Sequence, residues 1–316
     1  MALQLPAFSC ADTVPAAPVL AVLRHGVEGD IPLPLLAGPA LDIWQGAGDI
    51  RSGVVDGVRW VESNDSVFLQ LTIADAEWAQ DPAAATEAAY RKLEAARRAC
   101  GASHWWRLWN YLGGIVEGEG DAERYRQFTL GRHRAWSATG QLEAPLPAAT
   151  AIGCGRGLHV FALAGRSAAE AIENPRQVNA WRYPRAYGAQ PPSFARASLV
   201  RAGDAGWLFV SGTASIVGHE SRHVGDAAAQ FAEARANLDA VVAAAAQRIG
   251  IDERCFTARN FKLYWSRLSD ARQHAALADA LHALAPTQVL HGAVCRRELA
   301  VEIEALYALE PGIADA

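Results

Sequence analysis

The stretch that decides the fold is GWLFVSGTASIV (206–217) followed, after a short glycine-containing connection, by DAAAQFAEARANLDAVVAAAAQRIG (226–250). The first segment is rich in β-branched and aromatic residues, which is typical of a strand. The second is rich in alanine, starts at Gly225-Asp226 and ends at Gly250 with Arg248 in its last turn, so it predicts a long helix. FTARNFKLYWSR (256–267) predicts a further strand. This order predicts a sheet that is covered on one face by a helix.

Outward from this stretch, both halves of the chain show the same order of strands, long helix, strand, helix and strand. The first half predicts a short apolar run at 19–23, a strand pair at 54–61 and 66–73, a helix at 81–100, a strand at 104–112 and a helix at 120–136. The second half adds strands at 149–153, 157–165 and 195–200, a helix at 270–284, and short strands at 287–291 and 297–303. Pro82 suits the first turn of its helix, and Asp121 is a candidate cap for the next one.

We therefore expect an α+β fold with two similar halves, in which mixed sheets have helices packed on one face. The polar, proline-containing stretch 139–147 is the predicted boundary. It divides the chain into an N-terminal domain at 1–145 and a C-terminal domain at 146–316.

Composition excludes several classes of function. The 316 residues include 29 Lys and Arg against 34 Asp and Glu, a net charge of −5, which disfavours nucleic-acid binding. No run of about 18 apolar residues is present, so we expect no membrane partner. The first residues lack the basic region of a secretory signal.

Five cysteines are scattered along the chain without any CxxC pair, which supports neither a disulfide framework nor a zinc ribbon. They are Cys10, Cys100, Cys154, Cys255 and Cys295. This usage predicts a reduced, cytoplasmic protein.

The segment HESRH (219–223) matches the HExxH pattern of zinc enzymes. Zinc binding by that pattern needs both histidines on one face of a helix. Here a strand-like stretch precedes the segment, Gly218 adjoins it, and the helix starts only at Asp226. We therefore predict no metal site.

A second glycine-bearing motif is GCGRG (153–157). A dinucleotide-binding loop would need a helix directly after it, but a strand follows, so the sequence predicts a hairpin turn. The chain carries neither GxxxxGK[ST] nor GxSxG, and phosphate-loop and nucleophile-elbow chemistry are unsupported.

The segment NPRQVNAWRYPRAYGAQPPSFARAS (174–198) is rich in proline, arginine and aromatic residues. A solvated loop rarely needs so many large rings. Arginine guanidinium groups beside tyrosine hydroxyls would suit a small substrate that bears carboxylates. The alternative is a long loop that packs over the edge of the core and leaves its arginines in solvent.

The C-terminal segment GAVCRRELAVEIEAL (292–306) shows strand-like alternation. One face would carry Cys295, Arg297, Leu299, Val301 and Ile303, and the other Arg296, Glu298, Ala300, Glu302 and Glu304. Glu302 is either an ordinary solvent-facing carboxylate or a general acid whose pKa is raised by burial.

Taken together, these segments resemble the chorismatase family. The matching stretches are WRLWNYL (106–112), ERYRQFTLGR (123–132), LPAATAIGCG (146–155), ENPRQVNAWRYPRAYGAQPPSFARAS (173–198), SGTASIVGHES (211–221) and CRRELAVEIEA (295–305). SGTAS followed by a helix is shared more widely with Rid/YjgF-like folds. The resemblance implies two such halves, similar to chorismate mutase, with the catalytic domain in the second.

The resemblance implies that chorismate is cleaved to 3-hydroxybenzoate, 4-hydroxybenzoate or both, with loss of the enolpyruvyl side chain as pyruvate. It places the catalytic acid at Glu302. Cys295 falls where a cysteine is associated with hydroxybenzoate formation, and Ala214 falls at a position thought to influence product choice. It implies no metal, nucleotide or redox cofactor.

The chemistry adds candidates for binding the substrate. Chorismate is a dianion, and its two carboxylates need cationic partners, for which Arg196 and Arg267 are the candidates. Tyr183 and Tyr187 are candidate hydroxyl donors. Protonation of the methylene carbon by Glu302 gives an oxocarbenium ion, which the substrate's own hydroxyl traps on the way to an aromatic product.

Three alternatives stay open at this point. The enzyme could hydrolyse chorismate to a dihydroxycyclohexadiene carboxylate, or the chain could be a Rid-like enamine hydrolase or small-ligand binder. It could also be a regulatory protein with a degenerate site. The assembly is predicted to be a monomer or a homotrimer.

Overall fold

The structure is a computed structural model that describes residues 4–266 and 271–310. The predicted substrate-binding residue Arg267 therefore lies outside the described residues. The α+β class expected from the sequence is confirmed, because mixed sheets are covered by few helices. The helices are α1 (Asp75–Gln80), α2 (Pro82–Ala99), α3 (Arg124–Thr139), α4 (Ala227–Ile249) and α5 (Ala271–His282).

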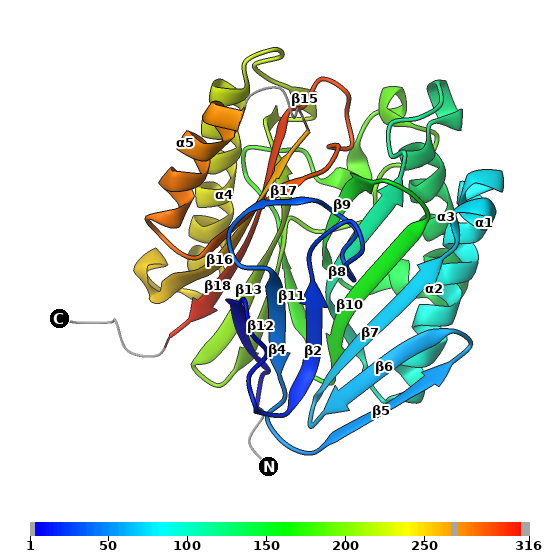
Figure 1. Ribbon diagram of the computed structural model, residues 1–316, viewed down its shortest axis with the longest axis vertical. Helices are drawn as coiled ribbons and strands as arrows, with labels where there is room; N and C mark the ends of the chain where they lie inside the picture. The colour runs from blue at the N-terminus through cyan, green and yellow to red at the C-terminus, as the bar shows by residue number, and fades with distance from the viewer. Residues whose placement is uncertain (1–3, 267–270, 311–316) are drawn as a thin grey trace.

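Three sheets pack around a shared interior (Figure 1). The first seven strands in chain order are β1 (Ala7–Ala11), β2 (Val19–Arg24), β3 (Leu35–Ala37), β4 (Leu41–Gln45), β5 (Ile50–Val55), β6 (Val58–Ser63) and β7 (Ser66–Ile73). They are followed by β8 (His104–Gly113), β9 (Ala148–Cys154), β10 (Leu158–Gly165), β11 (Ala169–Ile172), β12 (Ala197–Ala202) and β13 (Ala205–Ala214). The remaining strands are β14 (Ile216–Val217), β15 (Glu220–Ser221), β16 (Phe256–Trp265), β17 (Thr287–His291) and β18 (Val301–Leu309).

The two large sheets repeat one topology. The six-stranded sheet has the order β5-β6-β7-β10-β8-β9, and the seven-stranded sheet has the order β11-β12-β13-β18-β16-β17-β3. In each sheet, a helical segment connects β7 to β8 or β13 to β16. A second helix leads to the next strand, β9 or β17, which pairs in parallel with β8 or β16. The strand that follows, β10 or β18, then inserts between the two strands that the first helical segment connects. The shared order of elements predicted from the sequence is thus confirmed.

The first repeat extends further along the chain than the predicted boundary. Strands β9 and β10 are hydrogen bonded to β8, and β10 also pairs with β7, so the first sheet continues to Gly165. A boundary at residues 145/146 would separate these strands from their own sheet. The division into independently folding domains stays a prediction.

Helices cover the outer faces of the two large sheets (Figure 1). Helices α1–α3 lie on one side of the molecule and α4 and α5 on the other, with the sheets between them. The starts predicted for the two long helices, at Asp81 and at Gly225-Asp226, agree with the structure, in which an aspartate side chain caps each helix. Asp81 accepts a hydrogen bond from the Ala84 amide at 2.9 Å, and Asp226 accepts one from the Ala229 amide at 3.0 Å.

Four local predictions were wrong. Residues 54–61 form a hairpin rather than one strand, because Asp56 and Gly57 have φ values of 49° and 82° that suit a tight turn between β5 and β6. GCGRG is not a hairpin turn, since β9 and β10 flank β8 instead of pairing with each other. Helix α3 begins at Arg124, and Asp121 binds Arg185 instead of capping it.

The fourth correction concerns the C-terminal strand, which begins at Val301 and not at Arg297. From that point the predicted alternation holds, and both faces of β18 are buried. Val301 and Ile303 pack against the helices, whereas Glu302 and Glu304 lie on the opposite face, toward the interior between the sheets. Cys295 lies in the preceding loop. A central strand thus carries two acidic side chains into the core.

Candidate active site

A cavity of about 240 Å³ opens beside β18 and contains the residues that the sequence singled out. Six of the seven predicted site residues line it, namely Cys295, Tyr183, Tyr187, Arg196, Ala214 and Glu302. They come from four separate parts of the chain, which the fold brings together. The seventh residue, Arg267, is outside the described residues.

Glu302 is the acidic group of this cavity. The side chain is only 4% exposed, and burial raises the pKa of its carboxyl to about 8. The nearby Glu304 carboxylate raises this pKa further, while Arg107 and Arg196 act in the opposite direction. Within the part of the chain that the structure describes, no hydrogen bond reaches the Glu302 carboxyl. At neutral pH this group is therefore a buried, protonated acid that is free to donate.

Glycine at position 212 makes room for that acid. A Cβ atom on Gly212 would overlap Glu302 Oε1, so any side chain at this position would displace the carboxyl. The Gly212 amide donates to Thr150 Oγ1 at 2.9 Å, and the strand pairing shifts register between Val210 and Thr213 at this point. The SGTAS stretch thus brings backbone close to the acid, as glycines commonly do at ligand sites.

Arg196 supplies a buried cation on the cavity wall. Its guanidinium donates to the Val178 carbonyl and to the Tyr183 hydroxyl, both at 2.9 Å, and lies over the ring of Phe194. Only 5% of the residue is exposed, and its Nε has no partner among the described residues. A buried guanidinium with an unused donor is suited to binding an anionic group.

Arg296 is a second cation that the sequence reasoning did not select. Its guanidinium carbon lies 4.0 Å from the centre of the Tyr187 ring, and its Nη1 donates to the His219 carbonyl at 3.0 Å. Tyr187 in turn contacts His219 Nδ1 through its hydroxyl at 3.2 Å. The alternation expected at 292–300 does not exist, because those residues form a loop before β18. An arginine directly after Cys295 was the available signal.

Cys295 lies at the inner end of the cavity, next to Tyr125 and Glu302. Burial, with a smaller contribution from Glu302, raises the pKa of its thiol to about 12. Burial also raises the pKa of Tyr125 well above its ordinary value. Both groups are therefore neutral around pH 7, and Cys295 is a thiol rather than a reactive thiolate.

The HExxH segment lies outside any helix, as the sequence predicts. Its first residues belong to the small β14–β15 hairpin, and His223 has a φ of 56° just before the helix. Among the described residues, no group of three or more His, Cys, Asp or Glu side chains is arranged to hold a metal ion. None of the described helices is both long and apolar enough to span a membrane.

The cavity thus joins the neutral acid Glu302 to the guanidinium groups of Arg196 and Arg296 and to several tyrosine hydroxyls. Further charged side chains on its lining are Arg126, Arg297, Glu123 and Glu298. A small dianion would find counter-charges on the walls, and Glu302 could hand its proton to a carbon or oxygen atom held against it. Because the group is desolvated, its proton is available at neutral pH, where an exposed glutamate would already be ionised.

Comparisons with known proteins agree with this chemistry. A family model described as chorismatase FkbO/Hyg5-like, N-terminal, matches residues 42–164. A chorismatase of Streptomyces rapamycinicus is 36% identical over 276 residues, which cover 84% of this chain and 82% of that protein. A 3-hydroxybenzoate synthase of Streptomyces hygroscopicus is 34% identical and covers 85% and 81% of the two chains. A crystal structure of a chorismatase, 27% identical, superposes with a TM-score of 0.82 over 96% of this chain and 98% of that one.

Proposed function

The chain belongs to the chorismatase family, and from that premise we propose that it converts chorismate to hydroxybenzoate and pyruvate with Glu302 as the general acid. The name of one relative, a 3-hydroxybenzoate synthase, supports an aromatic product. Formation of 4-hydroxybenzoate beside the 3-isomer is part of the proposal. Hydroxybenzoate and pyruvate together contain all the atoms of chorismate, so the reaction consumes no water and no oxidant.

The observation that carries the proposal is the protonated Glu302 carboxyl on the cavity wall. The enol ether of chorismate becomes a leaving group only after its methylene carbon gains a proton. A carboxyl group with its ordinary pKa would be ionised at pH 7, but Glu302, with a pKa of about 8, still holds its proton there. Proton transfer leaves an oxocarbenium ion and a Glu302 carboxylate.

The ring hydroxyl of the substrate then attacks the ring carbon that bears the side chain and gives up its proton, and pyruvate leaves as the keto acid, because its methyl group already carries the proton from Glu302. The epoxide-like intermediate loses a ring proton, and its oxygen takes one up as the ring opens to the hydroxybenzoate. Glu302 regains a proton in this exchange, so the chain ends the cycle unchanged. The protein supplies position and electrostatics, because the substrate carries its own nucleophile.

Arg196 and Arg296 bind the two carboxylates in this proposal. Each guanidinium is fixed by a hydrogen bond to the backbone and stacks on an aromatic ring, so little freedom is lost on binding. Tyr183 and Tyr187 hold these guanidinium groups and can donate their hydroxyls. A contribution from Arg267 stays a prediction.

Cys295 and Ala214 shape the wall where the cation is trapped. The neutral thiol of Cys295 cannot take a proton from water, so it favours internal attack over hydrolysis by filling space beside Glu302. Ala214, the Cα partner of Glu302 in the pairing of β13 with β18, limits room on the other side. Both assignments concern product choice rather than rate.

Between a monomer and a homotrimer, we favour the monomer. The interior core draws apolar side chains from all three sheets of one chain, including Leu20, Phe161 and Phe209. The small sheet β1-β4-β2 thus closes the space between the two large sheets without a second subunit. The cytoplasmic location inferred from the cysteines is likewise part of the proposal.

The test is to incubate purified protein with chorismate alone and to identify the products by mass spectrometry. We expect equimolar pyruvate and hydroxybenzoate. A dihydroxycyclohexadiene carboxylate in place of the aromatic acid would instead support the hydrolytic alternative. If chorismate is unchanged while an enamine formed from an amino acid is hydrolysed in a parallel incubation, the proposal is wrong.

A further inference from the structure

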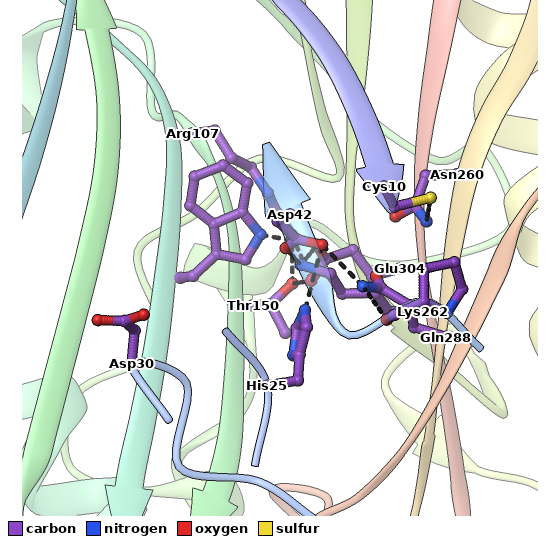
Figure 2. Close-up of polar contacts among 12 residues, drawn as sticks. Cys10, His25, Asp30, Asp42, Arg107, Thr150, Asn260, Lys262, Gln288 and Glu304 are labelled. Carbon is purple, nitrogen blue, oxygen red and sulfur yellow. Dashed lines mark hydrogen bonds and ion pairs between the residues drawn. The ribbon is translucent and has the colours of Figure 1, made fainter. Parts of the chain in front are cut away.

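A cluster of buried charges lies directly behind the cavity, between the two large sheets (Figure 2). Glu304 is at its centre and is 6% exposed. Its carboxylate accepts hydrogen bonds from Trp109 Nε1 at 2.7 Å and Tyr264 Oη at 3.0 Å. Arg107 Nη2 lies 2.9 Å from one carboxylate oxygen, and Lys262 Nζ lies 3.6 Å from the other.

The cluster is balanced in charge. Lys262 also contacts Asp42 at 2.6 Å, and Asp42 lies 3.1 Å from His25 Nε2. Two carboxylates thus face one ammonium and one guanidinium group, as Figure 2 shows for the labelled side chains. Burial alone would raise the pKa of Glu304, but Arg107 and Lys262 hold it below its ordinary value. Glu304 is therefore ionised, although it is inside the core.

The same cluster is linked to the catalytic acid in two ways. Glu302 and Glu304 are two residues apart on one strand and so point to the same face. Thr150 donates to Glu304 at 2.8 Å and accepts from the Gly212 amide at 2.9 Å, and Gly212 is the residue that touches Glu302. Charge and hydrogen bonding both connect the ionised carboxylate to the protonated one.

We propose that Glu304 is a positioning residue that keeps the proton on Glu302 between turnovers. It does so by placing a fixed negative charge beside the acid and by neutralising Arg107 and Lys262. Without Glu304, Arg107 would lose its carboxylate partner and Lys262 would keep only Asp42, and the excess positive charge would favour the Glu302 carboxylate. This inference rests on the proposed function, in which Glu302 must be protonated to act.

Other groups facing Glu302 cannot replace this effect. Cys295, from the loop before β18, and Tyr125, from α3, are neutral and contribute little charge. The nearest cations are Arg107 from β8, Arg132 from α3 and Arg196 from the segment before β12, and they favour loss of the proton. Farther charged residues of both signs also line the cavity, namely Arg126, Arg296, Arg297, Glu123 and Glu298. Among the described residues, Glu304 is the carboxylate that raises the pKa of Glu302.

The test is the pH dependence of kcat/KM for pyruvate release, which reports the ionisation of the free enzyme. In the wild type we expect activity to fall as pH rises through about 8, where Glu302 loses its proton. In Glu304→Gln the midpoint of this fall in activity should move down by at least one pH unit. Activity at pH 8.5 would then be at least about eightfold below the wild type, whereas activity at pH 5.5 would be similar.

Glu94→Gln is the matched control. Glu94 is also a buried carboxylate that accepts from a tryptophan, Trp105 Nε1 at 3.0 Å, and pairs with an arginine, Arg97, at 2.5 Å. It lies on α2, away from the cavity. We expect this variant to be less stable, but the midpoint of its fall in activity with pH should not move.

If Glu304→Gln does not fold, the double variant Glu304→Gln with Lys262→Met keeps the cluster balanced and should show a smaller shift in the same direction, because the negative charge beside Glu302 is lost together with one of the two cations. If a folded variant keeps the wild-type midpoint, or if its kcat/KM falls by the same factor at every pH, the inference is overturned while the proposed function stays intact. A wild type without pyruvate release at any pH would instead contradict the proposed function.

Discussion

The central strands of the two repeats, β10 and β18, occupy the same place but carry different chemistry. Their pairing aligns Leu163 with Leu306, because these residues lie opposite Phe68 and Phe209 on the preceding strands. By that alignment, His159 corresponds to Glu302, and Phe161 corresponds to Glu304. The inner face of β10 is thus mostly apolar, whereas that of β18 presents two carboxylates.

The connections before these strands differ as well. Residues 155–157 join β9 to β10, whereas residues 292–300 join β17 to β18. The longer connection supplies Cys295 and Arg296 to the cavity. One repeat serves as scaffold and the other carries the site, and the difference comes from one strand face and one loop rather than from the topology.

The largest effect is expected when the two equivalent side chains, Glu302 and His159, are each replaced by glutamine. Glu302→Gln should lower kcat/KM for pyruvate release by roughly 10³-fold, since a general acid contributes about 10²–10⁴-fold. His159→Gln should change it less than twofold, because the described hydrogen bonds of His159 are to Thr72 and the Arg156 carbonyl near the start of β10. The rates are measured by coupling pyruvate to lactate dehydrogenase. Equal losses in both variants would contradict the assignment.

The architecture was largely predictable from the sequence, whereas the site was only partly so. The starts of the long helices were predicted at Asp81 and at Gly225-Asp226, and hydrophobic alternation placed Glu302 correctly on β18. The hairpin at 50–63 was missed because a turn at Asp56-Gly57 interrupts a continuous run of β-forming residues.

Features that depend on distant parts of the chain could not be predicted. Strand β10 inserts beside β8 rather than β9, and no local pattern records such a return to the middle of a sheet. Arg296 was assigned to the C-terminal strand but lies in the loop before it. The charged cluster around Glu304 joins residues as far apart in the sequence as Asp42 and Glu304. Pairings of this range become visible only when the sheets are assembled.

Glu302 and His159 should also make the free energy of unfolding depend on pH with opposite signs. The pKa of Glu302 is raised to about 8, so the folded state holds a proton that the unfolded chain releases above pH 4.5, and stability falls as pH rises. Burial lowers the pKa of His159, so its penalty appears below about pH 6.5 and disappears as pH rises.

Urea unfolding of the variants at pH 5 and pH 7 measures this difference. Relative to the wild type, Glu302→Gln should gain roughly 2 kcal/mol more at pH 7 than at pH 5, at about 1.4 kcal/mol per pKa unit. His159→Gln should show its relative gain on the acidic side instead. The same pH trend in both variants would mean that Glu302 is not buried in its protonated form.

The smallest expected effect concerns the loop that distinguishes the second repeat. Cys295 is a neutral thiol at the inner end of the cavity, so Cys295→Ala should leave total pyruvate release within about threefold and alter the composition of the aromatic products. Cys154→Ala, at the end of β9 in the first repeat, provides the matched control and should alter neither. Chromatography of the products separates hydroxybenzoate isomers from any dihydroxycyclohexadiene carboxylate. An unchanged mixture in Cys295→Ala would show that this thiol only fills volume, and product choice would then depend on the strand face and not on the loop.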